Sequence, residues 1–169
     1  MENLRLVKLE SLNDNEISSL GEILEKSFES SMKDCPEKLK NMTVPKKEDI
    51  RISFEKGLEI QKIYFNDELV GGIVLNINED TNINEIELLF ISPTNLNKGL
   101  GSKVWKEIEN NYPNTKIWRL GTPPFQKRNI HFYINKCGFK IVEYFNKWHP
   151  MNDEEMDEDG LFLFEKVMK

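Results

Sequence analysis

Cysteine is scarce in this chain, which has two cysteines among 169 residues, Cys35 and Cys137. They lie far apart and form no Cys-x-x-Cys pair, so the sequence excludes a disulfide framework and a cysteine-based zinc site. We expect both to be reduced thiols in a cytoplasmic protein. At this length a chain buries roughly two thirds of its unfolded surface, which is enough for one apolar core.

Long hydrophobic runs are absent as well. No apolar run approaches the roughly 18 residues that a membrane-spanning helix needs, and the N-terminal residues contain no hydrophobic segment of the signal-peptide type. Lys and Arg number 23 against 29 Asp and Glu, a formal net charge of -6. This balance argues against nonspecific nucleic-acid binding and favours a cationic or neutral partner. We therefore expect no nucleic-acid partner and no membrane partner.

Histidine occurs twice, at His131 and His149. Neither has the His-x-x-x-His or carboxylate spacing of a metal site, so we expect no metal and place both histidines at the surface or at a pocket rim. The acidic run 153–159 is typical of a solvated loop. Alternatively, its charge could steer basic acceptors toward a site.

The most informative stretch is a predicted strand, loop and helix between Glu85 and Tyr112. Residues 86–91 are apolar except for Glu87, which predicts a strand buried on both faces of a sheet. Residues 100, 104, 108 and 112 are apolar at helical spacing and predict a helix with one apolar face. The loop 97–102 between them contains two glycines and leaves backbone amides unobstructed at a helix N-terminus, where anions bind favourably.

The glycine spacing excludes two nucleotide motifs. A dinucleotide fingerprint needs a third glycine where this chain has Val104, and a P-loop needs four residues between its glycines, whereas one residue separates Gly99 from Gly101. Alternatively, the glycine pair is only a tight turn before a helix.

The rest of the chain completes the pattern of an α/β domain. The segment 31–45 lacks a clear period and is expected to be a loop with a helical turn near 36–39. Gly71 and Gly72 indicate a bulge or close strand packing inside a hairpin. The order βααβββαβαββ predicts a mixed twisted sheet of about seven strands flanked by four helices. Strands are expected at 4–9, 60–65, 68–76, 86–91, 116–121, 139–145 and 161–167, and helices at 13–30, 45–57, 100–112 and 128–137.

A second motif lies in the last expected helix, which reads Arg-Asn-Ile-His-Phe-Tyr-Ile-Asn-Lys-Cys-Gly-Phe from Arg128 to Phe139. With the loop at 96–101 upstream, it resembles the GNAT superfamily of acyl-CoA-dependent N-acyltransferases. The pyrophosphate loop of that family reads Gln/Arg-x-x-Gly-x-Gly/Ala, and its later helix typically ends Phe/Leu-Tyr-x-x-x-Gly-Phe. The resemblance implies a single N-acetyltransferase-like domain over residues 1–169. One departure is Leu96 at the Gln/Arg position, which predicts a weaker phosphate contact.

The resemblance implies acetyl-CoA as the acyl donor. Its pantetheine arm would pair with strand backbone like an added strand, and its pyrophosphate would rest on loop amides. Lys98 would add a charge-assisted contact or remain a solvated lysine. The expected cofactor-binding residues are Leu89, Phe90 and Ile91 for the arm, Leu96, Asn97, Lys98, Gly99, Leu100, Gly101 and Ser102 for the pyrophosphate, and Asn129 and Tyr133 on the later helix.

Three residues are candidates for catalysis. Glu85 and Glu87 are two apart on one strand, hence on one face, and either could accept the amine proton; each could instead point to solvent or pair with a lysine. Tyr133 matches the family tyrosine that protonates the departing thiolate, or is a core tyrosine. Asn129 shares its helix face and could bond the cofactor arm or begin the helix.

The sequence thus predicts an N-acetyltransferase that joins an acetyl group to a primary amine by direct attack in a ternary complex. The acceptor would be a small-molecule amine or an exposed protein amine. The alternative is a noncatalytic acyl-CoA-binding or interaction domain on the same scaffold. A homodimer is expected only by analogy with the family.

Overall fold

The computed structural model describes residues 1–39 and 44–169. Part of the expected loop 31–45 therefore lies outside the described residues. The described part has the predicted order of strands and helices, with short 3₁₀ turns added, the first two being η1 and η2. Its elements are β1 (Leu4–Lys8), α1 (Asp14–Ser31), η1 (Met32–Asp34), η2 (Glu37–Leu39), α2 (Lys47–Glu55), β2 (Glu59–Phe65), β3 (Glu68–Asn76), β4 (Ile83–Ile91), α3 (Leu100–Asn111), β5 (Ile117–Thr122), α4 (Lys127–His131), β6 (Lys140–Phe145) and β7 (Leu161–Val167).

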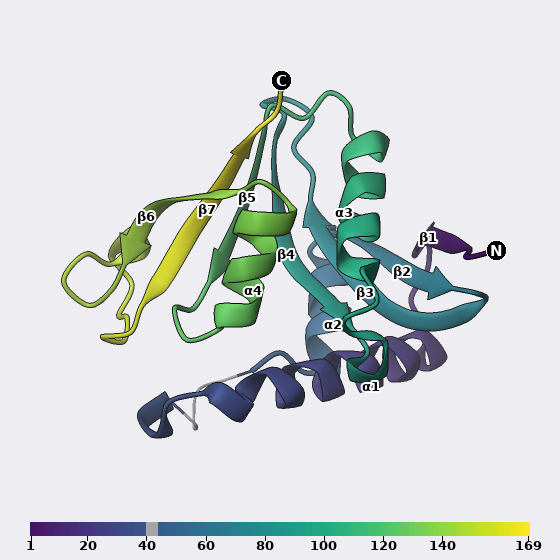
Figure 1. Cartoon of the computed structure of the whole chain (residues 1–169), viewed down its shortest axis with the longest axis horizontal. Helices are drawn as coiled ribbons and strands as arrows, with labels where there is room; N and C mark the ends of the chain where they lie inside the picture. Colours follow the sequence, from purple (N-terminus) through teal and green to yellow (C-terminus); the bar gives the residue numbers. More distant parts are fainter. Residues whose placement is uncertain (40–43) are drawn as a thin grey trace.

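The strands form one mixed seven-stranded sheet in the order β1-β2-β3-β4-β5-β7-β6. Among the described strands, only β4 and β5 are parallel neighbours, and they pair over just three residues of β4, from Ile83 to Glu85. Beyond Glu85 the two strands separate, so that the sheet opens into a fork between β4 and β5 (Figure 1). The α/β fold with a mixed seven-stranded sheet and four helices is confirmed.

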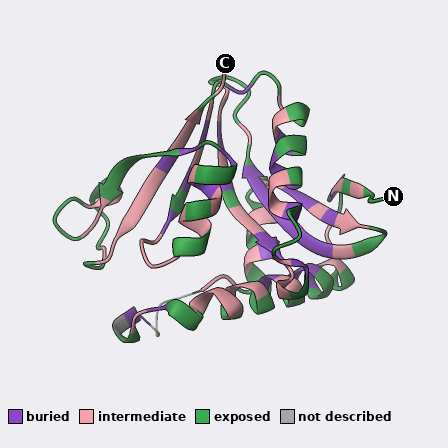
Figure 2. Cartoon of the chain, in the orientation of Figure 1, coloured by how far each residue is buried: buried purple, intermediate pink, exposed green. Residues whose placement is uncertain are grey.

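Helices cover both faces of the sheet. Leu20 and Leu24 of α1 and Ile50 of α2 pack in one apolar cluster with the Phe90 side chain of β4. The other cluster joins α3 to the opposite face and includes Tyr133 and Cys137 from the region of α4. Figure 2 shows the buried positions concentrated along the inner strands. Both cysteines are free and buried, as expected for small apolar side chains.

The hairpin glycines allow β3 and β4 to lie unusually close. A Cβ atom added to Gly71 would lie 2.1 Å from the Phe90 carbonyl oxygen, and one added to Gly72 would lie 2.6 Å from the Phe90 ring. The register also shifts at the start of β3, because Ile63 pairs with Gly71 while Tyr64 pairs with Leu69. The expected bulge and the expected close packing are both present.

Some element boundaries differ from the prediction. The second helix begins at Lys47 and not at Pro45, because Lys46 occupies the N-cap position and its backbone N–H donates to Asp49. The strand expected to be buried on both faces is only partly so, since Glu87 is exposed and Leu88 and Leu89 are half-buried. These three residues border the fork, because β5 no longer pairs with β4 beyond Glu85.

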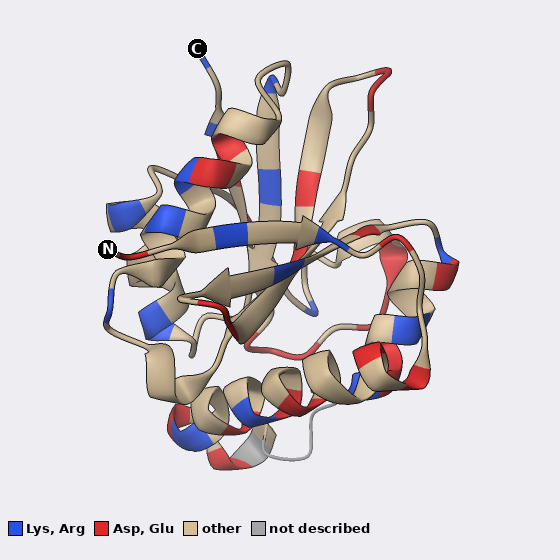
Figure 3. Cartoon of the chain, turned by 90° about the vertical axis from the view of Figure 1, so that its right-hand side faces the viewer, with Lys and Arg blue, Asp and Glu red and all other residues tan. Residues whose placement is uncertain are grey.

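The sheet edge at β6 exposes apolar side chains, including Ile141, Val142 and Tyr144. Exposed edge strands of this kind favour association, but the homodimer stays a prediction. Acidic and basic residues are intermixed along the helices in Figure 3. Within the described residues, no helix combines the length and apolarity that crossing a membrane would require.

Candidate active site

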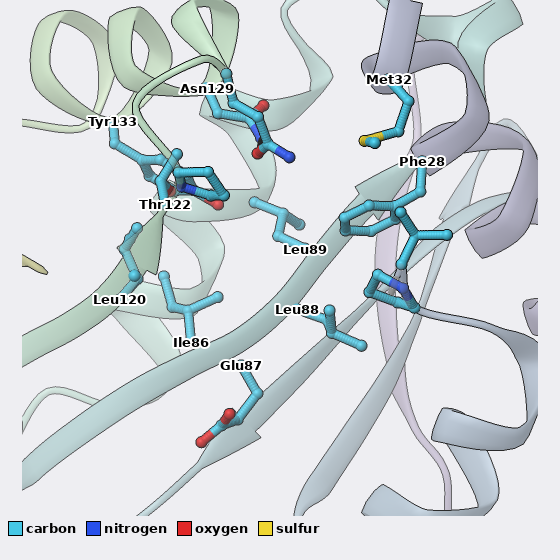
Figure 4. Close-up of a pocket in the computed structure, with 15 residues that line it drawn as sticks. Phe28, Met32, Ile86, Glu87, Leu88, Leu89, Leu120, Thr122, Asn129 and Tyr133 are labelled. Carbon is cyan, nitrogen blue, oxygen red and sulfur yellow. Dashed lines mark hydrogen bonds between the residues drawn. The ribbon is translucent and has the colours of Figure 1, made fainter. Parts of the chain in front are cut away.

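A cavity of about 190 Å³ lies where β4 and β5 diverge. Figure 4 shows Phe28 and Met32 on one side of it and Asn129 and Tyr133 on the other, with Leu89 between them. Its described lining consists of Phe28, Met32, Val44, Pro45, Ile86, Glu87, Leu88, Leu89, Leu120, Gly121, Thr122, Pro123, Gln126, Asn129 and Tyr133. We call it the fork cavity.

A second cavity of about 470 Å³ continues from the fork toward the start of α3. It shares Leu89, Asn129 and Tyr133 with the fork cavity. We call it the loop cavity, because its lining includes Leu96, Asn97, Gly99, Leu100, Gly101 and Ser102. The two cavities together form a path from the glycine loop to the fork.

Backbone groups of β4 face this path. The Ser92 N–H donates to the Val70 carbonyl oxygen at 2.7 Å, so the hydrogen-bonding direction of Ser92 is toward β3. Because this direction alternates in an antiparallel pair, the Phe90 amide and carbonyl also face β3. Those of Leu89 and Ile91 face the open fork. Of the three residues expected to pair with an extended ligand, Leu89 and Ile91 have backbone groups available.

The glycine loop presents a row of amides. From Asn97 to Ser102, no backbone N–H donates a hydrogen bond to the described residues. Gly99 has a left-handed φ of 71°, which favours glycine, and a Cβ atom on Gly101 would lie 2.9 Å from the Phe132 ring. The two glycines therefore have different roles: Gly99 permits the turn, and Gly101 permits contact between α3 and the helix after β5. Free amides at a helix N-terminus form an anion site.

Cations near this loop come mainly from the helical region after β5. Arg128 donates to the Asn97 side-chain oxygen at 2.9 Å, and Arg128, His131 and Lys136 all line the loop cavity. Arg128 and Lys136 were not among the residues predicted to bind the anion, although basic residues at positions 128, 131 and 136 were a readable signal. Lys98 donates to Asn95 at 3.2 Å and is not among the described residues lining the cavity.

Glu85 and Glu87 lie close together on β4, but they have different surroundings. Leu75 pairs with Ile86 while Val74 pairs with Leu88, so Glu87 is the extra residue of a β-bulge. Glu87 lines the fork cavity, and Glu85 accepts a hydrogen bond from Asn76 at 3.5 Å. Desolvation and the adjacent Glu85 carboxylate raise the pKa of Glu87. A raised pKa brings a carboxylate closer to the range in which a general base works near neutral pH.

Tyr133 lies where the two cavities meet and is 7% exposed. Its ring packs against Phe132, Phe139 and Phe164, with centroid distances of 5.1, 5.7 and 6.2 Å. The hydroxyl makes no hydrogen bond to the described residues. Burial raises the pKa of Tyr133. Its phenol therefore stays protonated at ordinary pH.

The helix that carries Tyr133 is one residue longer than the family pattern allows. Four residues separate Tyr133 from Gly138, whereas the motif quoted above has three, so the match to the motif is not exact. The structure accommodates the extra residue in a π-helical turn, η4 (Phe132–Lys136), in which the Cys137 N–H donates to the Phe132 carbonyl oxygen at 3.1 Å. This wider turn lets Tyr133 line the cavity while Gly138 still ends the helix at a φ of 81°.

The remaining candidate residues contribute less to the walls of the two cavities, or have other partners. The Asn129 amide lines both cavities and donates to Gln126, at the start of α4, at 2.7 Å. Leu96, the departure from the family pattern, packs on the core. Residues 153–159 line neither cavity in the described part of the chain. Among described residues, no group of three or more His, Cys, Asp or Glu is placed to hold a metal ion.

Comparison with known proteins identifies the fold and the family. The family model described as Acetyltransferase (GNAT) family matches residues 19–139. A Bacillus subtilis protein, uncharacterized protein YrkN, is 35% identical over 174 residues, covering 96% of this chain and 94% of that protein.

Solved structures agree at the level of the fold. A Bacillus subtilis acetyltransferase in complex with CoA has a TM-score of 0.69 and 18% identity, covering 99% of this chain and 100% of that one. The PaiA N-acetyltransferase of Thermoplasma acidophilum, in complex with coenzyme A, has a TM-score of 0.69 and 17% identity, covering 99% of both chains. The family match spans most of this chain, and the fork, glycine loop and sheet order accord with it. The chain therefore belongs to the GNAT acetyltransferase family.

Proposed function

We propose that this protein transfers an acetyl group from acetyl-CoA to a primary amine by direct attack. The observation that carries the proposal is the continuous path from the free amides of the glycine loop to the fork, with Tyr133 at the junction and Glu87 on the far wall. The chain is an acyltransferase by family, and this path supplies separate places for a phosphate group, an extended arm and an amine.

The residues present fit acetyl-CoA. The amides from Asn97 to Ser102 would hold the pyrophosphate, with Arg128 and Lys136 adding positive charge. Outward-facing backbone groups of Leu89 and Ile91 would pair with the amides of the arm. When bound, acetyl-CoA supplies an activated carbonyl and a thiol leaving group.

The side chains at the fork account for the proton transfers. An amine that attacks the carbonyl carbon forms the new C–N bond, the C–S bond breaks, and one amine proton must leave. Glu87, with its raised pKa, accepts that proton directly or through water. Tyr133, whose phenol stays protonated, donates a proton to the sulfur. It regains a proton from Glu87 through water or from solvent, so that both side chains return to their starting states. The products are an N-substituted acetamide and a free thiol.

The competing proposal is a noncatalytic acyl-CoA-binding domain, because Leu96 replaces the family Gln/Arg. Backbone amides supply most of the anion contacts in the proposed site, so this replacement weakens binding without removing it. The decisive experiment measures thiol release from acetyl-CoA with a panel of amines, alongside the melting temperature with coenzyme A. Amine-dependent thiol release supports the enzyme. Stabilisation by coenzyme A with no turnover on any amine would favour the binding domain, and no stabilisation would reject both.

A further inference from the structure

The walls of the fork cavity are mainly apolar. Side chains from both sides of the fork contribute, including Phe28 from α1, Leu88 from β4 and Leu120 from β5. The other apolar lining residues are Met32, Val44, Pro45, Ile86, Leu89 and Pro123. An acceptor in this cavity would therefore place hydrocarbon, and not hydrogen-bonding groups, against most of the wall.

The charge among the described lining residues of the fork cavity is negative. Among the described residues that line it, Glu87 is the one charged side chain, and no Lys or Arg is present. Glu85 acts on Glu87 as a second negative charge, and Lys56 acts on it from outside the lining. The described lining thus offers a partner to one ammonium group and none to a carboxylate.

The cavity also limits the acceptor's size. Its volume is about 190 Å³. An apolar protein cavity of about 150 Å³ holds benzene. The acceptor's substituent is accordingly compact, with roughly five to eight carbons on the same scale.

We propose that the preferred acceptors are primary monoamines with a compact, uncharged apolar substituent, and that amino acids and diamines are poor acceptors. This inference rests on the proposed acetyl transfer. An α-carboxylate would lie beside the negative charge of Glu87, and none of the described lining residues is a cation that could pair with it. The second ammonium of a diamine would lie against hydrocarbon, which is also unfavourable.

Matched pairs of acceptors test the proposal. Phenethylamine and phenylalanine differ by one carboxylate, and pentylamine and 1,5-diaminopentane differ by one ammonium. We expect kcat/KM for thiol release to favour phenethylamine over phenylalanine by about 100-fold and pentylamine over the diamine by about 10-fold. An alanine-initiated peptide in the same panel represents a protein amine and is expected to be poor.

A charge introduced at the wall provides a second test. Met32 is half-buried at the end of α1 and faces Tyr133 and Asn129 across the cavity (Figure 4). Met32→Lys would give the carboxylate of phenylalanine a partner, so the phenethylamine preference should fall about tenfold. Met151→Lys is the matched control, since Met151 is also half-buried but does not line the cavity. It should leave the preference unchanged.

The possible outcomes distinguish failure of the proposed acceptor class from failure of the proposed acetyl transfer. Turnover that is fastest with phenylalanine, the diamine or the peptide would overturn the acceptor class while upholding acetyl transfer. A preference that Met32→Lys does not alter would show that this wall does not set specificity. Absence of thiol release with every amine would reject the proposed activity and the acceptor class with it.

Discussion

Removal of the Tyr133 hydroxyl is the most direct test of the proposed proton donor. The variant Tyr133→Phe keeps the ring and its contacts with Phe132, Phe139 and Phe164. Because the hydroxyl makes no hydrogen bond to the described residues, its loss leaves no broken pair behind. We expect the melting temperature to change by less than about 2 °C, or to rise.

The catalytic effect should be moderate. General acid catalysis contributes about 10²- to 10⁴-fold, but a thiol with a pKa near 8.5 leaves more readily than an amine or alcohol. We therefore expect kcat for Tyr133→Phe to fall about 10- to 100-fold, equivalent to about 1.4–2.7 kcal/mol of transition-state stabilisation. The KM for acetyl-CoA should change little.

The assay is steady-state thiol release at saturating acetyl-CoA, with melting curves on the same samples. Tyr144→Phe is the matched control, because its hydroxyl donates to the carbonyl oxygens of Glu158 and Asp159 far from the cavities and should not affect kcat. An unchanged kcat in Tyr133→Phe would refute the role of the phenol. So would a loss of activity that simply followed a lower melting temperature.

Three further predictions concern the surroundings of the site. Glu85→Gln should lower the pKa of Glu87, measured by carboxyl ¹³C NMR, because a neighbouring negative charge is removed. The pKa of Glu87 should stay above the ordinary value, since desolvation persists. An unchanged pKa would contradict the interaction between the two carboxylates. Gly71→Ala should lower the melting temperature by about 6–12 °C, given a clash with the Phe90 carbonyl costing about 3 kcal/mol; an unchanged melting curve would count against the strand register. Arg128→Ala should raise KM for acetyl-CoA about 3- to 10-fold, and an effect confined to kcat would contradict phosphate binding.

Much of the fold could be read from the sequence because its signals are local and strong. The hairpin around Asn66-Asp67 has both turn residues at positive φ, 50° and 65°, as its sequence predicts. The apolar spacing of α3 places Leu100, Val104 and Ile108 in the core. Hydrophobic period and turn chemistry determine these elements independently of the rest of the chain.

The site was only partly predictable, because its geometry depends on irregularities that leave little trace in a single sequence. The bulge at Glu87 and the separation of β4 from β5 come from pairing between distant segments. Strict alternation therefore could not show which glutamate borders the cavity. The contribution of Phe28 and Met32 to the opposite wall depends on how α1 packs on the sheet, and no motif encodes that packing.

The π-helical turn suggests that this helix tolerates a change of length. Relative to the family motif it contains one additional residue, which lies in the π-helical turn between Phe132 and Cys137. Deleting Asn135, which is exposed and bonded to His131, would restore the shorter spacing and close the turn into ordinary α-helix. If the protein has the proposed activity and the shortened form retains it, the position of the Tyr133 phenol is set by both ends of the helix and not by the number of residues between them.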